Sequence, residues 1–80
     1  MNTSKVIKIQ GLTDVYNFIA EATKVDGDVI IKRGRFVVDA KSVMGVFSID
    51  MSNAVTVTYP AGATEFDQYL NNFIVTSTED

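Results

Sequence analysis

The chain has 80 residues, of which 46% are hydrophobic and 21% are charged, and its formal net charge is −3. This length and composition indicate one ordered globular domain over residues 1–80, and they argue against a second domain and against an intrinsically disordered protein. Cysteine and histidine are both absent, which excludes disulfides, thiolate nucleophiles, Cys/His metal sites and imidazole acid–base chemistry.

Charge and hydropathy also limit the partners. The net negative charge gives no general attraction to nucleic acid or to anionic lipid. No apolar run approaches the roughly 18 residues that a membrane span needs, and the N-terminus is polar, so we expect a cytoplasmic protein that binds neither nucleic acid nor membrane. The bases Lys32, Arg33 and Arg35 flank Gly34 between two β-prone runs, which favours a solvated hairpin turn.

The first segments predict a strand followed by an amphipathic helix. Residues 5–9 are β-prone and are expected to form the first strand. Residues 13–25 have helical periodicity, with Thr13 as the expected N-cap and Asp14 in the first turn. The apolar stripe of this helix consists of Val15, Phe18, Ile19, Ala22 and Val25.

Three further runs predict extended structure. Residues 28–32 and 36–40 are expected to form a hairpin around Arg33 and Gly34. Residues 54–59 read AVTVTY, and this alternation of valine and threonine is typical of a strand with one buried face and one exposed face. These runs supply the second, third and fourth strands.

Two further helices are predicted. Ser42 is a good N-cap for a short helix over residues 42–48. The last helix is expected over residues 64–74, with Thr64 as N-cap and Asp67 three residues later in a capping-box-like arrangement. Its apolar stripe consists of Phe66, Tyr69, Leu70, Phe73 and Ile74.

The predicted element order is therefore βαββαβα. Strands of antiparallel type with one apolar face bury that face most simply under helices. We expect the α/β (α+β) class, as an open-faced two-layer sandwich with a four-stranded antiparallel sheet and three helices on one face.

The run KSVMGVFSI at residues 41–49 resembles the stretch around the regulatory serine of HPr, the phosphocarrier protein of the bacterial sugar phosphotransferase system. The predicted element order is also the order of that family. The resemblance covers about residues 5–74, and we expect the tail over residues 75–80 to be frayed. It implies an HPr-like fold for the whole chain.

The family's phosphohistidine site is degenerate in this sequence. HPr proteins carry phosphate on a histidine just before the first helix, with an arginine two residues later and commonly a proline next. Counting back from Ser42 without gaps, these positions hold Gly11, Thr13 and Asp14, which supply neither an imidazole nucleophile nor a cation. The chain is similar to the catabolite-repression type of HPr, which also lacks the histidine and keeps the serine.

Ser42 matches the serine that a dedicated kinase phosphorylates in the family, so the resemblance implies regulatory phosphorylation at this residue. A phosphate at a helix N-terminus is favoured by the helix dipole and by free amides. The alternative is that Ser42 only caps its helix. Gly45 inside this helix costs about 1 kcal/mol relative to alanine, so we expect a close approach there.

The apolar residues after Ser42 are the candidate docking surface. A one-turn helix cannot bury all of its circumference, and we expect Val46 and Ile49 to face the sheet. Val43, Met44 and Phe47 are left as the partner-binding residues. In HPr proteins the equivalent residues contact partner enzymes and regulators, which implies partners among phosphotransferase-system proteins or transcription regulators.

Other functions remain open at the sequence level. The chain could be a generic interaction module that forms a domain-swapped or edge-paired homodimer, or a phosphocarrier whose acceptor is Asp14 or Ser42. An enzyme is not expected, because there is no arrangement typical of an activated nucleophile and no phosphate-binding glycine loop. Asp26 and Asp28 alone are too few for a metal site and favour a turn, so neither a metal nor another cofactor is expected.

Overall fold

The computed structural model describes residues 1–75, so the expected frayed tail lies outside the described residues except for Val75. Its elements follow the predicted order, with one additional 3₁₀ turn at the end. The bounds are β1 Asn2–Ile7, α1 Leu12–Thr23, β2 Ile30–Arg33, β3 Phe36–Asp39, α2 Val43–Phe47, β4 Val55–Pro60, α3 Thr64–Leu70 and η1 Asn71–Phe73.

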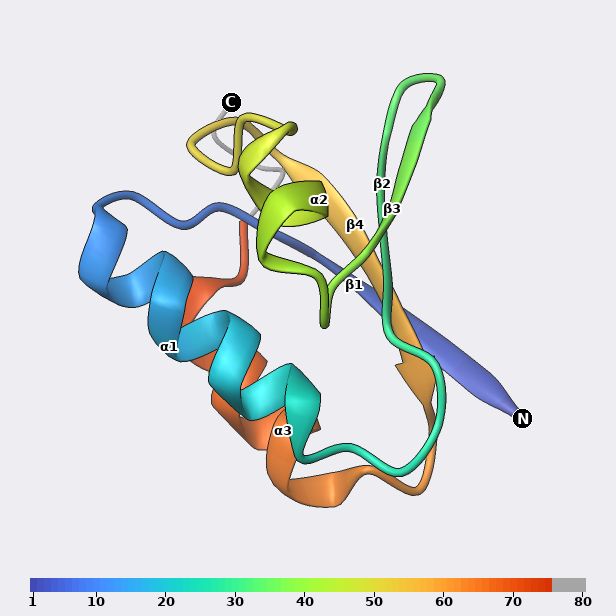
Figure 1. Cartoon of the computed structure of the whole chain (residues 1–80). Coiled ribbons are helices and arrows are strands. Elements are labelled where there is room, and N and C mark those ends of the chain that lie inside the picture. The colour runs from blue at the N-terminus through green and yellow to red at the C-terminus, as the bar shows by residue number, and fades with distance from the viewer. Residues whose placement is uncertain (76–80) are drawn as a thin grey trace.

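The strands form one four-stranded antiparallel sheet in the order β1-β4-β2-β3. The three α-helices lie on one side of this sheet, with α1 and α3 side by side and α2 near the β2–β3 hairpin (Figure 1). This arrangement confirms the predicted open-faced two-layer sandwich. The hairpin forms one border of the sheet, and β1 forms the other.

The core lies between the sheet and the helices. Val55, Val57 and Tyr59 of β4 are at most 1% exposed, whereas the threonines between them are half-buried on the open face of the sheet. The predicted apolar stripe of α1 is buried in full. The two predicted periodicities, two for β4 and 3.6 for α1, therefore identify the core faces correctly.

The first strand is displaced from its expected position. β1 covers Asn2–Ile7 instead of residues 5–9, because it pairs along the whole of β4, from Asn2 opposite Pro60 to Ile7 opposite Val55. Ile9 is buried although it lies beyond the strand, and its N–H donates to the carbonyl of Met51 at 2.8 Å. Pairing with a distant strand, not local β-propensity, set these bounds.

Both threonines expected to cap long helices are inside the helices instead. α1 begins at Leu12 with Gly11 as N-cap, so Thr13 lies in the first turn. α3 has Ala63 as N-cap, and the Thr64 hydroxyl donates to the carbonyl of Gly62 at 3.4 Å. The N-cap of α1 lies two residues before the predicted one and the N-cap of α3 lies one residue before, and no side chain caps either helix.

The last helix is shorter than expected. α3 ends at Leu70, and after the 3₁₀ turn Ile74 forms an antiparallel bridge with Ile7. Ile74 is 40% exposed, so its expected place in the buried stripe is wrong. The backbone N–H of Val75 donates to the carbonyl of Val6 at 3.1 Å, so the end of the described chain covers part of the outer edge of β1.

Candidate protein-docking site

Ser42 is the N-cap of α2, as predicted. Its backbone is extended, and its Oγ accepts a hydrogen bond from the N–H of Gly45 at 3.1 Å. The preceding turn is fixed by Asp39, whose Oδ1 accepts from the N–H of Lys41 at 2.8 Å. The ammonium group of Lys41 donates to the carbonyl of Val25 at 2.8 Å, which directs this cation towards the end of α1.

Helix α2 has an inner face and an outer face. Val46 is fully buried and Ile49, just after the helix, is 7% exposed, whereas Met44 is 85% exposed. The outward orientation predicted for Met44 and Phe47 is correct, and Val43 is also exposed. Because α2 has only five residues, its position depends on packing of the inner face against the sheet.

Gly45 makes that packing close. A Cβ at this position would lie 3.3 Å from Ser42 Oγ and 3.4 Å from the Cβ of Val38 in β3. The close approach expected from a glycine inside a helix is therefore present, and β3 and the capping serine make it. Gly45 brings the exposed face of α2 and the Ser42 hydroxyl into a fixed position over the hairpin.

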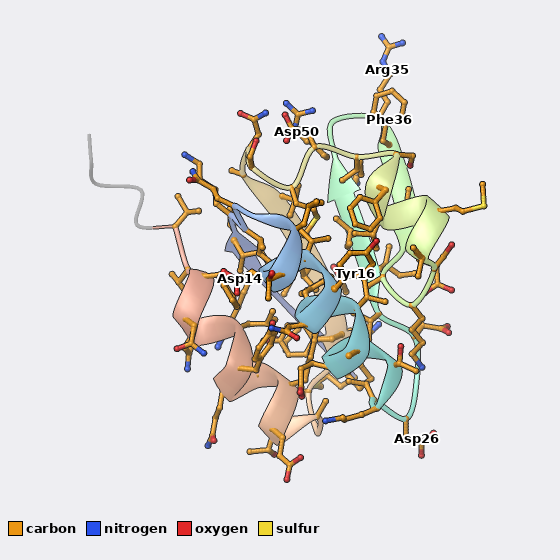
Figure 2. All side chains as sticks on the ribbon, turned by 60° about the vertical axis from the view of Figure 1, so that its left-hand side comes forward. Asp14, Tyr16, Asp26, Arg35, Phe36 and Asp50 are labelled. Atoms are coloured by element: carbon orange, nitrogen blue, oxygen red, sulfur yellow. The ribbon has the colours of Figure 1, made fainter. Side chains whose placement is uncertain are left out.

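Two residues of α1 extend the exposed apolar face of α2, and sequence reasoning missed both. Leu12 is 66% exposed and Tyr16 is 55% exposed. The ring of Tyr16 packs on Phe47, with 5.3 Å between ring centroids, and Figure 2 shows Tyr16 on the outer side of α1. An available signal was their i, i+4 spacing outside the buried stripe of α1.

We use the name docking surface for the five exposed apolar residues Leu12, Tyr16, Val43, Met44 and Phe47. A shallow cavity of about 270 Å³ lies between the start of α1 and α2, and Leu12 and Phe47 line it together with Val46 and Ile49. Exposed methionine and aromatic side chains are enriched in protein interfaces. The arrangement can therefore accommodate an apolar side chain from a partner protein.

The three positions predicted to match the phosphohistidine site lie at the start of α1. Gly11, Thr13 and Asp14 are all exposed, with Gly11 as N-cap and the other two in the first turn. Gly11 has a φ of +96°, a conformation that residues with a side chain rarely adopt. The local backbone at this position is thus adapted to glycine.

The remaining acidic pair is part of a turn. Asp26 and Asp28 are exposed on either side of Gly27, whose φ is +130°. Within residues 1–75 no group of three or more acidic side chains could hold a metal ion. In the same part of the chain, no helix is long and apolar enough to cross a membrane.

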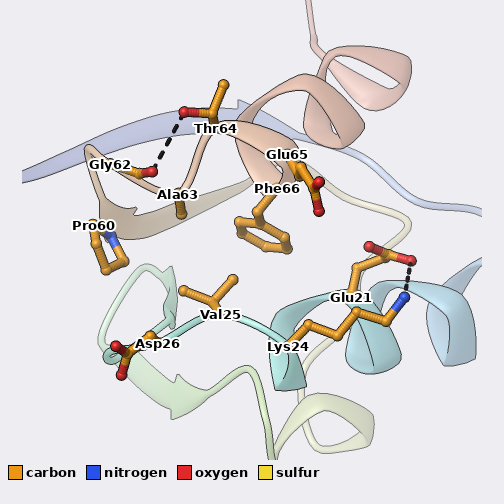
Figure 3. Close-up of a pocket in the computed structure, with 10 residues that line it drawn as sticks. All are labelled: Glu21, Lys24, Val25, Asp26, Pro60, Gly62, Ala63, Thr64, Glu65 and Phe66. Atoms are coloured by element: carbon orange, nitrogen blue, oxygen red, sulfur yellow. Dashed lines mark hydrogen bonds and ion pairs between the residues drawn. The ribbon is translucent and has the colours of Figure 1, made fainter.

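An open cleft of about 510 Å³ lies at the other end of α1, beside the start of α3 (Figure 3). Its lining includes three carboxylates, those of Glu21, Asp26 and Glu65, and one ammonium group, that of Lys24. Lys24 lies 3.2 Å from Glu21, so the cation is already paired. This acidic lining disfavours a phosphate or another anion in the cleft.

Comparison with known proteins supports the fold. No protein-family model matches the chain, and no curated protein matches it. Among solved structures, it is similar to a phosphocarrier protein HPr from Bacillus anthracis str. Ames, with a TM-score of 0.71 and 23% sequence identity. The match covers 92% of this chain and 98% of that chain. The chain therefore has the fold of phosphocarrier protein HPr.

Proposed function

We propose that this protein is an HPr-like interaction module that binds a partner protein through the docking surface and does not carry phosphate on histidine. The observation that carries the proposal is the set of exposed apolar side chains on α1 and α2, in which Tyr16 packs on Phe47. When a partner protein covers these side chains, they would supply the apolar centre that a protein interface needs. The protein acts by contact and is not an enzyme.

The composition supports the loss of phosphocarrier activity. The sequence contains no histidine, and phosphohistidine requires an imidazole nitrogen as nucleophile. Gly11 occupies the matching position, and Asp14 adds a negative charge in the first turn of α1, where it would repel a phosphate. Incubation with phosphoenolpyruvate and the first enzyme of the phosphotransferase system should therefore leave the intact mass unchanged; an acid-labile phosphate would contradict this part of the proposal.

Ser42 is the proposed control point of the docking surface. A phosphate on its hydroxyl adds a charge of about −1.5 to −2 directly beside Val43. The nearby Asp39 carboxylate is negative as well, and Lys41 is engaged with the carbonyl of Val25. The new charge would thus be weakly neutralised and would change which partners the apolar face accepts, without ordering a new segment.

Phosphorylation at Ser42 has a direct test. An HPr kinase with ATP should add one phosphate to the intact protein, and Ser42→Ala should abolish the addition. Ser48→Ala is the matched control, because Ser48 lies at the other end of α2. No change in mass, or a phosphate that persists in Ser42→Ala, would remove the switch from the proposal but leave the docking surface in place.

Docking is tested with candidate phosphotransferase-system proteins and transcription regulators, the partner classes implied by the HPr-like fold. We expect Phe47→Ala and Tyr16→Ala to weaken binding by about 1 to 2 kcal/mol each, that is, roughly 5- to 30-fold in Kd by titration calorimetry. Phe36→Ala is the matched control, because Phe36 is 66% exposed but lies on β3. Equal effects of Phe47→Ala and Phe36→Ala, or no binding at all, would contradict the proposal.

A further inference from the structure

The strand β3 is an open edge of the sheet. It is the last strand in the order β1-β4-β2-β3, so one side of its backbone has no neighbouring strand within residues 1–75. The other border differs, because Ile74 and Val75 pair with part of β1. Proteins usually protect an open edge, since its row of unpaired N–H and C=O groups is a template for another strand.

Two exposed side chains on this edge are apolar. Phe36 is 66% exposed and Val37 is 58% exposed. Figure 2 shows Phe36 beside Arg35 at the outer end of the hairpin, away from the core. Neither proline nor lysine interrupts the strand, although these are the residues that commonly block edge pairing. Both apolar residues lie on β3, apart from the docking surface on α1 and α2.

The geometry of the hairpin determines which backbone groups point outward. Arg33 pairs with Phe36 across a two-residue turn, and the φ of +60° at Gly34 fits that turn. The residues that flank such a turn exchange hydrogen bonds, and bonded and non-bonded pairs then alternate along the ladder. The next pair, Lys32 with Val37, is non-bonded, so the N–H and C=O of Val37 point to the open edge.

The strand and the turn residue Arg35 directly before it are together self-complementary in charge. Residues 35–39 read RFVVD. If a second copy pairs antiparallel about a twofold axis at Val37, Arg35 lies opposite Asp39, and Phe36 lies opposite Val38. Arg35 forms no ion pair or side-chain hydrogen bond within the described chain. The carboxylate of Asp39 uses only Oδ1, which accepts from Lys41 N–H, while its backbone carbonyl accepts from Ser42 N–H at 3.0 Å.

We propose that β3 is a homodimer interface, in which two copies pair antiparallel through residues 35–39 and join their sheets into one. At the twofold axis the two Val37 residues exchange both backbone hydrogen bonds, and an Arg35–Asp39 pair closes each end. Exposed ion pairs add little affinity but select this register, because a shift of two residues separates both pairs. The contact is isologous, so assembly ends at the dimer. The interface covers only a short strand, and because so small an interface binds weakly, the dimer is reversible.

Sedimentation equilibrium of the full chain tests the proposal, over about 10 µM to about 1 mM protein. The average mass should rise from that of one chain towards that of two. Val37→Pro should remain monomeric, because proline removes the outward N–H without breaking a bond to β2. The urea transition of the variant verifies that it is folded. A wild type that stays monomeric over the whole range, or that grows beyond a dimer, would overturn the proposal.

Charge reversal gives a second test that does not depend on a single variant. Arg35→Asp places two carboxylates opposite each other at each end of the interface, and Asp39→Arg places two guanidinium groups there. Each variant alone should dimerise at least about tenfold more weakly, which corresponds to about 1.4 kcal/mol. An equimolar mixture should restore dimers, because each end then pairs an aspartate with an arginine.

The mixture also shows that both variants are folded, since misfolded chains would not rescue each other. A dimer that persists in both Arg35→Asp and Val37→Pro would overturn the proposal. So would a dimer that is lost in Phe47→Ala but not in Val37→Pro, because the contact would then lie on α2. Partner binding by the docking surface is measured at concentrations too low for edge pairing, so the two ideas succeed or fail separately.

Discussion

The hydroxyl of Tyr59 connects β4 with α3. Tyr59 is fully buried, and its hydroxyl donates to Asp67 Oδ1 at 2.5 Å, while Lys5 Nζ lies 3.1 Å from the same oxygen. Burial, together with the Asp67 carboxylate, raises the pKa of Tyr59 well above its usual value. The hydrogen bond from Tyr59, and then that from Lys5, lowers the pKa of Asp67. Asp67 therefore links two strands to the helix that it was expected to cap.

We expect Tyr59→Phe to lower the free energy of unfolding by about 1 kcal/mol at pH 7, measured by urea denaturation. The pKa of Asp67 is lowered in the folded state, so the stabilisation by its carboxylate is complete above the ordinary pKa of about 4 and is lost as the pH falls through the folded-state pKa. The difference between wild type and variant should shrink below about pH 4. A difference independent of pH would show that the carboxylate is not the partner that matters.

The two predicted caps Ser42 and Thr13 differ in the structure, and this difference can be measured. Ser42→Ala should lower the free energy of unfolding by about 1 kcal/mol, because the Gly45 N–H loses its acceptor. Thr13→Ala should change it by less than about 0.5 kcal/mol, since α1 begins before Thr13. Thermal and urea denaturation of both variants checks this, and equal losses would contradict the assigned helix start.

At the scale of elements, α2 is held by one face. We expect Val46→Ala to cost about 1 to 3 kcal/mol, because Val46 is fully buried and its removal leaves a cavity. Met44→Ala should stay within about 0.5 kcal/mol, because Met44 is 85% exposed. Urea denaturation measures both changes. A large loss from Met44→Ala would mean that its side chain is covered in solution.

The helices were easier to predict than their ends. The apolar stripe of α1 follows from spacing along a single segment, and every residue of it is buried. The end of α3 does not follow from the spacing of residues 64–74. After Leu70 the chain turns to β1, and Ile74 bridges Ile7. Backbone groups on a distant strand compete with helical hydrogen bonds there, and no local pattern reports that competition.

At the scale of the whole molecule, a sandwich with one core should unfold as one unit. The core is one cluster of buried residues that includes members of every strand except β3 and of every α-helix. We expect a single cooperative urea transition with a free energy of unfolding of about 4 to 12 kcal/mol. Far-ultraviolet circular dichroism and tyrosine fluorescence should give coincident midpoints. Two separate transitions would contradict the prediction of one domain over residues 1–80.

In the candidate site, too, some residues could be predicted from their neighbours in sequence and others could not. Ser42 and the outward face of α2 were predicted, because capping and i, i+4 spacing are properties of consecutive residues. Leu12 and Tyr16 were missed, because only packing of α1 beside α2 brings Tyr16 onto Phe47. A surface shared by two elements cannot be assigned from either element alone.

The sequence by itself determined the chemistry that is absent and the faces that are buried. Without histidine there is no phosphohistidine, and hydrophobic periodicity assigns the core sides of α1 and β4 because side-chain direction follows the local backbone. The tertiary structure alone decided that β1 pairs with β4, that the chain end covers β1, and that β3 remains open. These features depend on hydrogen bonds between residues far apart in the chain, whose partners are specified only when the whole sheet has formed.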